Sequence, residues 1–208
     1  IERAPAGYLS EVDALRVLAA YGFPVVEPVL VQSAADAVAA ANRVGYPVVL
    51  RVVSPDIVHK FDVGGVILDL SSPEEVRAAY ERMRADLARN APRARITGIL
   101  VRRMIPEGKQ VILGLKRDEV FGHLVMFGLG GVYVEVFKDV TFRLVPIDPL
   151  SAAKMISYTK AAKVLQGFRG EPPSDVAAVE ECLMRLSQLA SDLPRIAEMD
   201  VNPLIVHE

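Results

Sequence analysis

The amino-acid sequence predicts an α+β protein made of two lobes. Helical and strand-like patterns alternate over roughly the first half of the chain, whereas the second half opens with consecutive strand-like runs and ends with helices. A chain of 208 residues is long enough to bury a core in each of two such lobes. We expect lobe A to cover about residues 24–102, and lobe B to cover about residues 103–208 together with an N-terminal helix at 10–21.

Each predicted helix of the first half begins at a serine, whose side-chain oxygen can accept a hydrogen bond from the exposed N–H groups of a helix start. These serines are Ser10, Ser33 and Ser72, and Gly22 and Gly45 follow the ends of the first two helices. Short β-branched runs between the helices predict strands. The expected helices are 10–21, 33–44 and 72–90, and the expected strands are 24–31, 47–53 and 66–70.

The second half begins with three strand-like runs separated by turns, which predict a meander. They cover residues 96–105, 109–117 and 123–128, and a further strand is expected after the glycine cluster "GLGG". Helical patterns follow at 149–157, 160–166 and 174–191. The last run, 195–206, predicts strand structure broken at Asn202–Pro203. We expect the two lobes to meet near residues 100–103.

Composition excludes several classes of function. The net charge is −2, so no basic field indicates a nucleic-acid partner. No apolar run approaches the length of a membrane span, and no signal peptide opens the sequence, so we expect no membrane partner. A single cysteine, Cys182, is compatible with a reducing cytoplasm, where we expect the protein to be located. The isoleucine at the start and the apolar run at the end predict a piece of a longer protein.

The stretch "HKFDVGG" holds one of the three histidines, His59, beside Lys60 and before Gly64 and Gly65. A glycine pair lets the backbone approach a phosphate closely, and the lysine supplies a point charge. The imidazole could act as a base, a metal ligand or a phosphate acceptor. On its spacing alone, the stretch is more typical of a glycine turn in a hairpin with a solvated His–Lys pair, because short glycine motifs match by accident.

Two further stretches could bind a ligand. The loop "GLGGVYVE", residues 128–135, could face a phosphate, although a hairpin corner is the simpler interpretation. In "EMDVNPL", the side chains of Glu198, Asp200 and Asn202 alternate along the chain, so a strand would send all three to one face. Carboxylate and amide oxygens suit Mg²⁺. The alternative is the polar face of an edge strand.

The order and spacing of these stretches identify a resemblance to a known family. The chain resembles the ATP-grasp domain of nucleoside-diphosphate-forming acyl-CoA synthetases, such as the β subunit of ADP-forming acetyl-CoA synthetase, and is more distantly similar to succinyl-CoA synthetase β. The similarity covers nearly the whole chain. It is carried by "LSEVDALRVLAAYGFPV", "VGYPVVLRVVSPDIVHKFDVGGV", "GLGGVYVEVFKDVTFRLVP", "GFRGEPP" and "EMDVNPL".

The resemblance implies an ATP-grasp fold, in which two α+β lobes clasp ATP or ADP with Mg²⁺. It implies the phosphoryl-transfer part of an acetate–CoA ligase, with His59 relaying phosphate and Asp200 facing a phosphohistidine of the partner. Asn202, together with Asp200, would hold the metal. The residues expected to contact the nucleotide are Arg51, Lys60, Gly64 and Gly65 at the phosphates, and Val101, Arg102, Arg103 and Met104 at the hinge that reads adenine.

The same resemblance implies that catalysis needs a CoA-binding ligase subunit or fused domain. A small carboxylic acid or acyl phosphate, and CoA, would be handled there, so the chain alone is expected to be incomplete as an enzyme. Three features depart from the family pattern: Arg51 replaces the usual lysine, Gln110 replaces a glutamate, and the sequence stops before the strand whose aspartate completes the magnesium site. The first two favour an alternative, a regulatory nucleotide-binding domain fused to a protein acetyltransferase.

Overall fold

The structure is a computed structural model that describes residues 7, 9–57, 59–131, 139–167 and 170–208. Its chain divides into two compact units. Unit 1 comprises Ile1–Ala20 and Pro24–Ile105, and unit 2 comprises Tyr21–Phe23 and Pro106–Glu208. None of the described helices is both long and apolar enough to cross a membrane.

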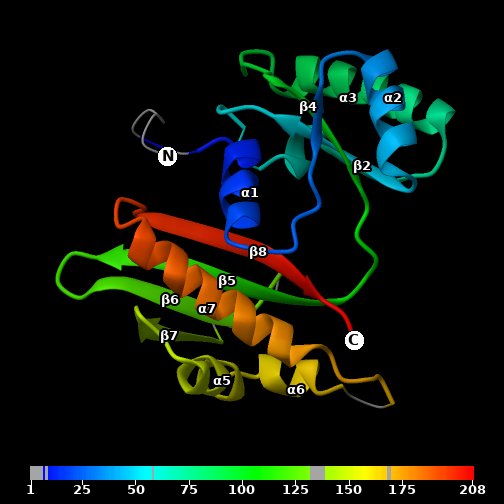
Figure 1. The fold of residues 1–208 in the computed structure, drawn as a ribbon. Helices are drawn as coiled ribbons and strands as arrows, with labels where there is room; N and C mark the ends of the chain where they lie inside the picture. The colour runs from blue at the N-terminus through cyan, green and yellow to red at the C-terminus, as the bar shows by residue number, and fades with distance from the viewer. Residues whose placement is uncertain (1–6, 8, 58, 132–138, 168–169) are drawn as a thin grey trace. The chain divides into compact units, whose positions relative to one another are not determined.

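Unit 1 is a four-stranded antiparallel sheet with helices packed on it (Figure 1). The strand order is β1-β4-β2-β3, so β4 and β2 are the central strands. Helix α2 contacts β1 and β4, and α3 contacts β2 and β3. Its elements are α1 (Glu11–Ala20), β1 (Val29–Val31), α2 (Ala34–Val44), β2 (Val48–Val53), the 3₁₀ turn η1 (Phe61–Val63), β3 (Val66–Leu70), α3 (Pro73–Asn90) and β4 (Gly98–Arg103).

The core of unit 1 lies between its sheet and the helices α2 and α3. Alternate residues of each central strand enter it, including Leu50 and Val52 of β2 and Val101 of β4. Arg51 and Arg102, which follow Leu50 and Val101 in sequence, therefore project from the opposite face of the sheet. This alternation places two arginines on one face of the central strands.

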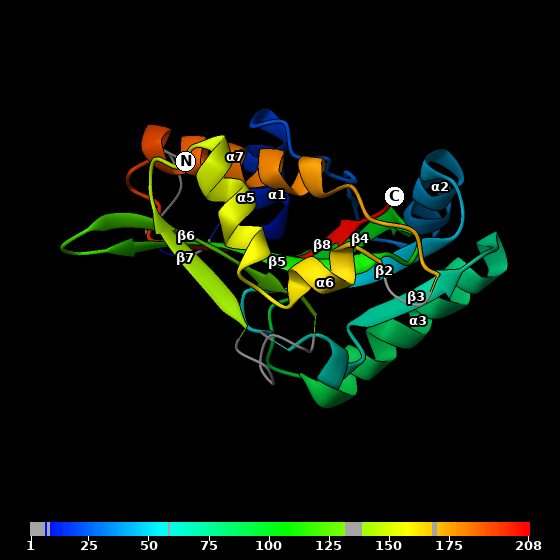
Figure 2. The same ribbon diagram turned by 90° about the horizontal axis from the view of Figure 1, so that it is seen from below.

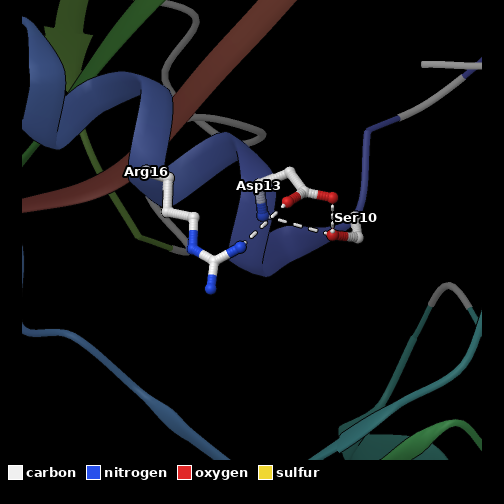
Figure 3. A network of polar contacts seen from close by, with 3 residues as sticks. All are labelled: Ser10, Asp13 and Arg16. Atoms are coloured by element: carbon white, nitrogen blue, oxygen red, sulfur yellow. Dashed lines mark hydrogen bonds and ion pairs between the residues drawn. The ribbon is translucent and has the colours of Figure 1, made fainter. Parts of the chain in front are cut away.

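The serine caps predicted from the sequence are confirmed. Ser33 and Ser72 each accept a hydrogen bond from the backbone N–H three residues on, at 3.1 Å in both cases. Ser10 does the same for α1, accepting from the Asp13 N–H at 3.2 Å (Figure 3). The Asp13 carboxylate in turn accepts from the Ser10 hydroxyl and pairs with Arg16 at 3.5 Å. A capped start fixes where α1 begins, and Glu11 is its first residue.

Unit 2 is a second four-stranded antiparallel sheet, with strand order β7-β6-β5-β8 (Figure 2). Helix α7 contacts β5 and β6, α5 contacts β6 and β7, and α6 contacts β5. The buried residues include Leu113, Phe127 and Leu186. Its elements are β5 (Lys109–Asp118), β6 (Gly122–Leu129), β7 (Val140–Leu144), α5 (Pro149–Ser157), α6 (Ala161–Leu165), α7 (Val176–Asp192) and β8 (Glu198–Val206).

One sequence prediction about the sheets is wrong, and a second is confirmed in part. The run at 96–105 does not join a meander with the two runs that follow, because β4 pairs with β1 and β2 in the first sheet. The last strand, β8, is a single element from Glu198 to Val206. Its pairing with β5 is nevertheless interrupted at the predicted position, because Val111 pairs with Leu204 and Leu113 with Val201, which leaves Asn202 and Pro203 in a β-bulge. The strand expected after "GLGG" falls on residues 132–138, outside the described residues.

The division into units differs from the expected lobes in two details. The chain passes from unit 1 to unit 2 between Ile105 and Pro106, slightly later than the predicted meeting point. Helix α1, which we grouped with lobe B, belongs to unit 1. Only Tyr21–Phe23, directly after α1, belong to unit 2. Two hydrogen bonds hold them there: the Tyr21 hydroxyl donates to Asp192 at 3.0 Å, and Arg185 donates to the Gly22 carbonyl.

Candidate functional site

Unit 1 holds a cluster of three cations and one carboxylate, which we call the cation cluster: Arg51, Lys60, Arg102 and Glu11. Arg51 and Arg102 come from the face of β2 and β4 that is opposite to Leu50 and Val101, where Arg51 pairs across the strands with Leu100, and Arg102 with Val49. Glu11, at the start of α1, places Oε2 3.3 Å from the Nε of Arg51. The cluster carries more positive than negative charge, so it is suited to an anionic ligand.

The electrostatics of the cluster show that its members act on one another. The pKa of Lys60 is lowered from its ordinary value of 10.5, first by burial and then by the charge of Arg51, while Glu11 opposes both. Burial also lowers the pKa of Arg102, again against the charge of Glu11. The negative charge of an incoming phosphate would therefore offset the repulsion between these cations and compensate for their desolvation.

The loop between β2 and β3 carries His59 and Lys60 in the arrangement that the sequence predicts. His59 is exposed, Lys60 is half-buried, and η1 follows directly. Gly64 has φ +74°, in the left-handed region, which explains a glycine at that position. Gly65 has no room for a side chain, because a Cβ there would lie 2.5 Å from Val52 Cγ1.

The two glycines do not offer free N–H groups to a phosphate in this conformation. The Gly64 N–H donates to the Phe61 carbonyl at 3.1 Å, and the Gly65 N–H donates to the Lys60 carbonyl at 2.7 Å. The Gly65 carbonyl accepts from Val52 at 2.8 Å. These bonds close the loop against β2, so the glycines shape the loop that presents His59 and Lys60. Direct phosphate contact by Gly64 and Gly65 stays a prediction.

The segment expected to read adenine lies at the end of β4. The four residues differ in exposure: Val101 is buried in the core, Arg102 is half-buried, Arg103 is exposed, and Met104 is partly buried. Val101 is paired with Val29 on one side and Leu50 on the other, so neither its side chain nor its backbone faces outward. The Met104 N–H donates to the Pro47 carbonyl at 2.8 Å. Adenine contact by these residues stays a prediction, and Val101 is the weakest candidate.

In unit 2, β8 carries a polar face. Glu198, Asp200 and Asn202 are exposed, whereas Met199 and Val201 between them are partly buried, so the three polar side chains share one face as the sequence predicts. Asp200 lies opposite Gly114 of β5, and a Cβ on that glycine would lie 3.2 Å from Asp200 Oδ1. The glycine thus leaves room for the Asp200 carboxylate.

The Asn202 side chain is tied to the glycine loop that follows β6. Its Oδ1 accepts the Gly131 N–H at 3.0 Å. The neighbouring Gly130 N–H donates to the Gln110 carbonyl at 2.9 Å, and a Cβ on Gly131 would collide with the Gln110 side-chain oxygen. Gln110, Gly131 and Asn202 are therefore in contact. Of the predicted loop 128–135, only residues 128–131 are described.

The donor set on this face fits a magnesium ion that completes its coordination with ligand oxygens. Asp200 offers a carboxylate and Asn202 an amide oxygen, and Mg²⁺ in nucleotide sites is held by one or two protein groups together with phosphates and water. Although Asp200 is largely exposed, partial desolvation of its carboxylate raises its pKa, and the charge of Glu198 raises it further, so a cation would stabilise the ionised form. Within the described residues no three His, Cys, Asp or Glu side chains gather around a common point.

Sequence reasoning missed Glu11. Its only sequence signal is its position after the capping residue Ser10, which marks an acidic residue in the first helical turn. Glu11 and Arg51 are forty positions apart in the chain, and a contact between such distant residues cannot be predicted from the sequence pattern. The charges of Glu11 and Arg51 act on the pKa of Arg102, so we include Arg102 in the cation cluster, while its predicted contact with adenine stays a prediction.

The family of the chain follows from comparison with known proteins. The sequence profile of the ATP-grasp domain matches residues 1–208, so the chain belongs to the ATP-grasp family. Its two α+β units agree with the predicted fold class.

Among curated proteins, the chain is 41% identical to the β subunit of acetate–CoA ligase [ADP-forming] I of Pyrococcus furiosus, over 100% of this chain and 90% of that one. It is 44% identical to 4-hydroxybutyrate–CoA ligase [ADP-forming] of Nitrosopumilus maritimus, over 96% of this chain and 29% of the relative. The chain thus spans nearly the whole of a separate β subunit but less than a third of the longer ligase.

The chain is also similar to solved structures of dinucleotide-forming acetyl-coenzyme A synthetase 1 from Ca. Korarchaeum cryptofilum. One, in complex with coenzyme A, Ca-AMPCP and HgCl⁺, has a TM-score of 0.92 and 47% identity over 96% of this chain and 87% of that chain. Another, with coenzyme A and Mg-AMPPCP, has its phosphohistidine segment pointing towards the nucleotide-binding site. Its TM-score is 0.81, with 43% identity over 91% of this chain and 82% of that chain.

Proposed function

We propose that this chain is the nucleotide-binding, phosphoryl-transfer domain of an ADP-forming acyl-CoA synthetase of the acetate–CoA ligase type. The observation that carries the proposal is the 41% identity to a ligase β subunit over the full length of this chain and 90% of the relative. The cation cluster and the polar face of β8 support it, because they supply the charges that ATP and Mg²⁺ require.

In this proposal Arg51, Lys60 and Arg102 bind phosphate oxygens, and their positive charge offsets the charge that develops during transfer. Asp200 and Asn202 would hold Mg²⁺, which when bound neutralises charge on the phosphates. His59 is exposed on the loop that also carries Lys60. A neutral imidazole nitrogen forms a bond to the phosphorus of an arriving phosphoryl group as the bond to its previous carrier breaks. The phosphoryl group then passes on by the same displacement.

The proposal includes a partner. A CoA-ligase subunit or fused domain would bind the carboxylic acid and CoA, in line with relatives that are either separate β subunits or longer chains. We include a cytoplasmic location, which the single, buried and unpaired Cys182 supports. The identity of the acid belongs to the partner, and acetate and 4-hydroxybutyrate are the first candidates to test, because they are the acids named for the relatives.

The test uses the full-length protein with its partner portion. With ATP, Mg²⁺, CoA and a panel of carboxylic acids, we expect ADP and an acyl-CoA to form together. With labelled ATP, we expect an acid-labile, base-stable phosphoprotein, part of whose label maps to His59. The variant His59→Asn should bind ATP but form no acyl-CoA. Turnover of His59→Asn at the unsubstituted rate would refute the relay, and absence of nucleotide binding by the unsubstituted protein would refute the whole proposal.

A further inference from the structure

Glu11 forms an ion pair with one side of the Arg51 guanidinium. Glu11 approaches the Nε side of the guanidinium, at 3.3 Å. The Nε atom is itself buried, and the contact falls short of hydrogen-bond geometry. Both side chains are only partly exposed, 36% for Arg51 and 24% for Glu11, so the pair is screened less than a surface ion pair.

This arrangement leaves the other side of the guanidinium available. A guanidinium has five N–H donors in a planar fork, and two partners can bind its different edges at the same time. No described residue forms a hydrogen bond with the terminal nitrogens of Arg51. A carboxylate at Nε and a phosphate at the terminal nitrogens are therefore compatible.

Glu11 also acts on the other two cations. Its negative charge raises the pKa of Lys60 and the pKa of Arg102, against the effect of burial, which lowers both. Without Glu11, Arg51, Lys60 and Arg102 would repel one another with nothing in the cluster to offset them. Such repulsion favours side-chain positions that move the cations apart.

We propose that Glu11 is a positioning residue for phosphate binding: it holds Arg51 by the Nε side and keeps the three cations together, so that the terminal nitrogens of Arg51 receive a phosphate group. This inference rests on the proposed nucleotide binding at the cation cluster. Glu11 acts through Arg51 and is not a ligand of the phosphate.

The arrangement requires arginine at position 51, because only a guanidinium can bind Glu11 and a phosphate at different edges. A lysine ammonium is a single point charge without separate edges. In an Arg51→Lys protein, Glu11 and the phosphate would compete for that one charge. Glu11 should therefore assist phosphate binding when position 51 is arginine and oppose it when position 51 is lysine. A merely structural role of Glu11 would give the same effect in both backgrounds.

The experiment measures binding of AMPPCP with Mg²⁺ by calorimetry, in the full-length protein and in its Arg51→Lys variant. Glu11→Gln should weaken binding about two- to fivefold in the unsubstituted background, the range expected for a partly exposed ion pair. In the Arg51→Lys background the same change should strengthen binding. Equal fold-changes in the two backgrounds, in whichever direction, would overturn the proposal.

Two further variants keep the test decisive if Arg51→Lys binds too weakly to measure. Glu11→Asp retains the negative charge, but its shorter side chain moves the carboxylate away from the Nε of Arg51. The affinity for AMPPCP should therefore fall as it does in Glu11→Gln. An unchanged affinity would overturn the positioning role. Glu81→Gln is the matched control, because it makes the same change at an exposed position on α3 and leaves the Ser10–Asp13 cap of α1 intact (Figure 3). Affinity should not change in Glu81→Gln. Absence of AMPPCP binding in the unsubstituted protein would refute the proposed function instead.

Discussion

Gly131 donates its N–H to the Oδ1 of Asn202 at 3.0 Å, and this bond ties the glycine loop after β6 to the polar face of β8. The amide oxygen that we assign to the metal is thus already oriented by a backbone donor. An oriented ligand loses less freedom when the ion binds. The glycine is needed because Gly131 has φ +65° and sits against the Gln110 side chain.

Asn202→Ala should weaken nucleotide binding only when Mg²⁺ is present. The change removes an oxygen ligand but leaves the cation cluster of unit 1 intact. We expect a loss of about tenfold in the apparent affinity for Mg²⁺, typical of a disturbed metal site. Calorimetric titration of the protein with ADP, once in the presence of Mg²⁺ and once in the presence of EDTA, measures the nucleotide affinity with and without the metal. An equal loss of ADP affinity with Mg²⁺ and with EDTA would mean that Asn202 acts by holding the glycine loop after β6 and not by binding the metal.

Gln110→Glu should strengthen Mg²⁺ binding. Gln110 contacts Gly131, whose N–H is bonded to Asn202, so a carboxylate at position 110 would add negative charge beside the proposed ligands. We expect several-fold tighter binding of Mg²⁺ in the presence of ADP. Gln32→Glu is the control for added charge, since Gln32 is an exposed residue of unit 1. Tighter binding in both variants would indicate a general charge effect.

Local features of this fold could be predicted from sequence, because local contacts determine them. Ser33 and Ser72 cap the helices where expected, and Asp200 and Asn202 share a strand face because side chains alternate along any strand. Sheet membership could not be predicted. The strand β4 resembles its neighbours in sequence, yet it pairs with β1 and β2, and such pairing depends on contacts between distant segments.

In the candidate site, too, contacts between residues distant in the sequence could not be predicted. Arg51, Lys60 and His59 could be identified by residue type and by the family resemblance, but their surroundings could not. The N–H groups of Gly64 and Gly65 look available in the sequence, whereas the fold uses both within the turn. Glu11 could not be recognised, because its role depends on an ion pair between α1 and β2, which are distant in the sequence.

The affinity for nucleotide should fall at high pH, and Lys60 should be the cause. Its pKa in the free protein is lowered from 10.5, mainly by burial, and a bound phosphate would raise it again. Binding is therefore at full strength below the free-protein pKa of Lys60 and weakens as the pH rises through that value. Calorimetry from pH 7 upward should show this decline.

The variant Lys60→Arg tests whether deprotonation of Lys60, and not of another group, causes the decline of nucleotide affinity at high pH. The guanidinium stays charged throughout the range, so the decline should disappear. Lys163→Arg, at an exposed position on α6, should leave it unchanged. If the decline persists in Lys60→Arg, another group is responsible, and Lys60 does not bind the phosphate through its charge.

Gly65→Ala should reduce both stability and nucleotide affinity. A Cβ at this position would lie 2.5 Å from Val52 Cγ1 and 2.9 Å from the Lys60 carbonyl oxygen, so the loop must move away from β2. Overpacking of this kind costs about 1–3 kcal/mol in the free energy of unfolding. The displaced segment is the one that carries His59 and Lys60, and the hydrogen bond from Gly65 to the Lys60 carbonyl would be strained.

Gly122→Ala is the control that distinguishes loss of stability from loss of the site. Gly122 has φ +81° and open space around its Cβ direction, so alanine there costs backbone energy, about 1–2 kcal/mol, without a collision. It begins β6, and the cation cluster belongs to unit 1. Urea unfolding should show comparable losses for the two variants, whereas calorimetry with AMPPCP should show weaker binding only for Gly65→Ala. Unchanged affinity in Gly65→Ala would mean that the shape of this loop does not position Lys60 for the phosphate.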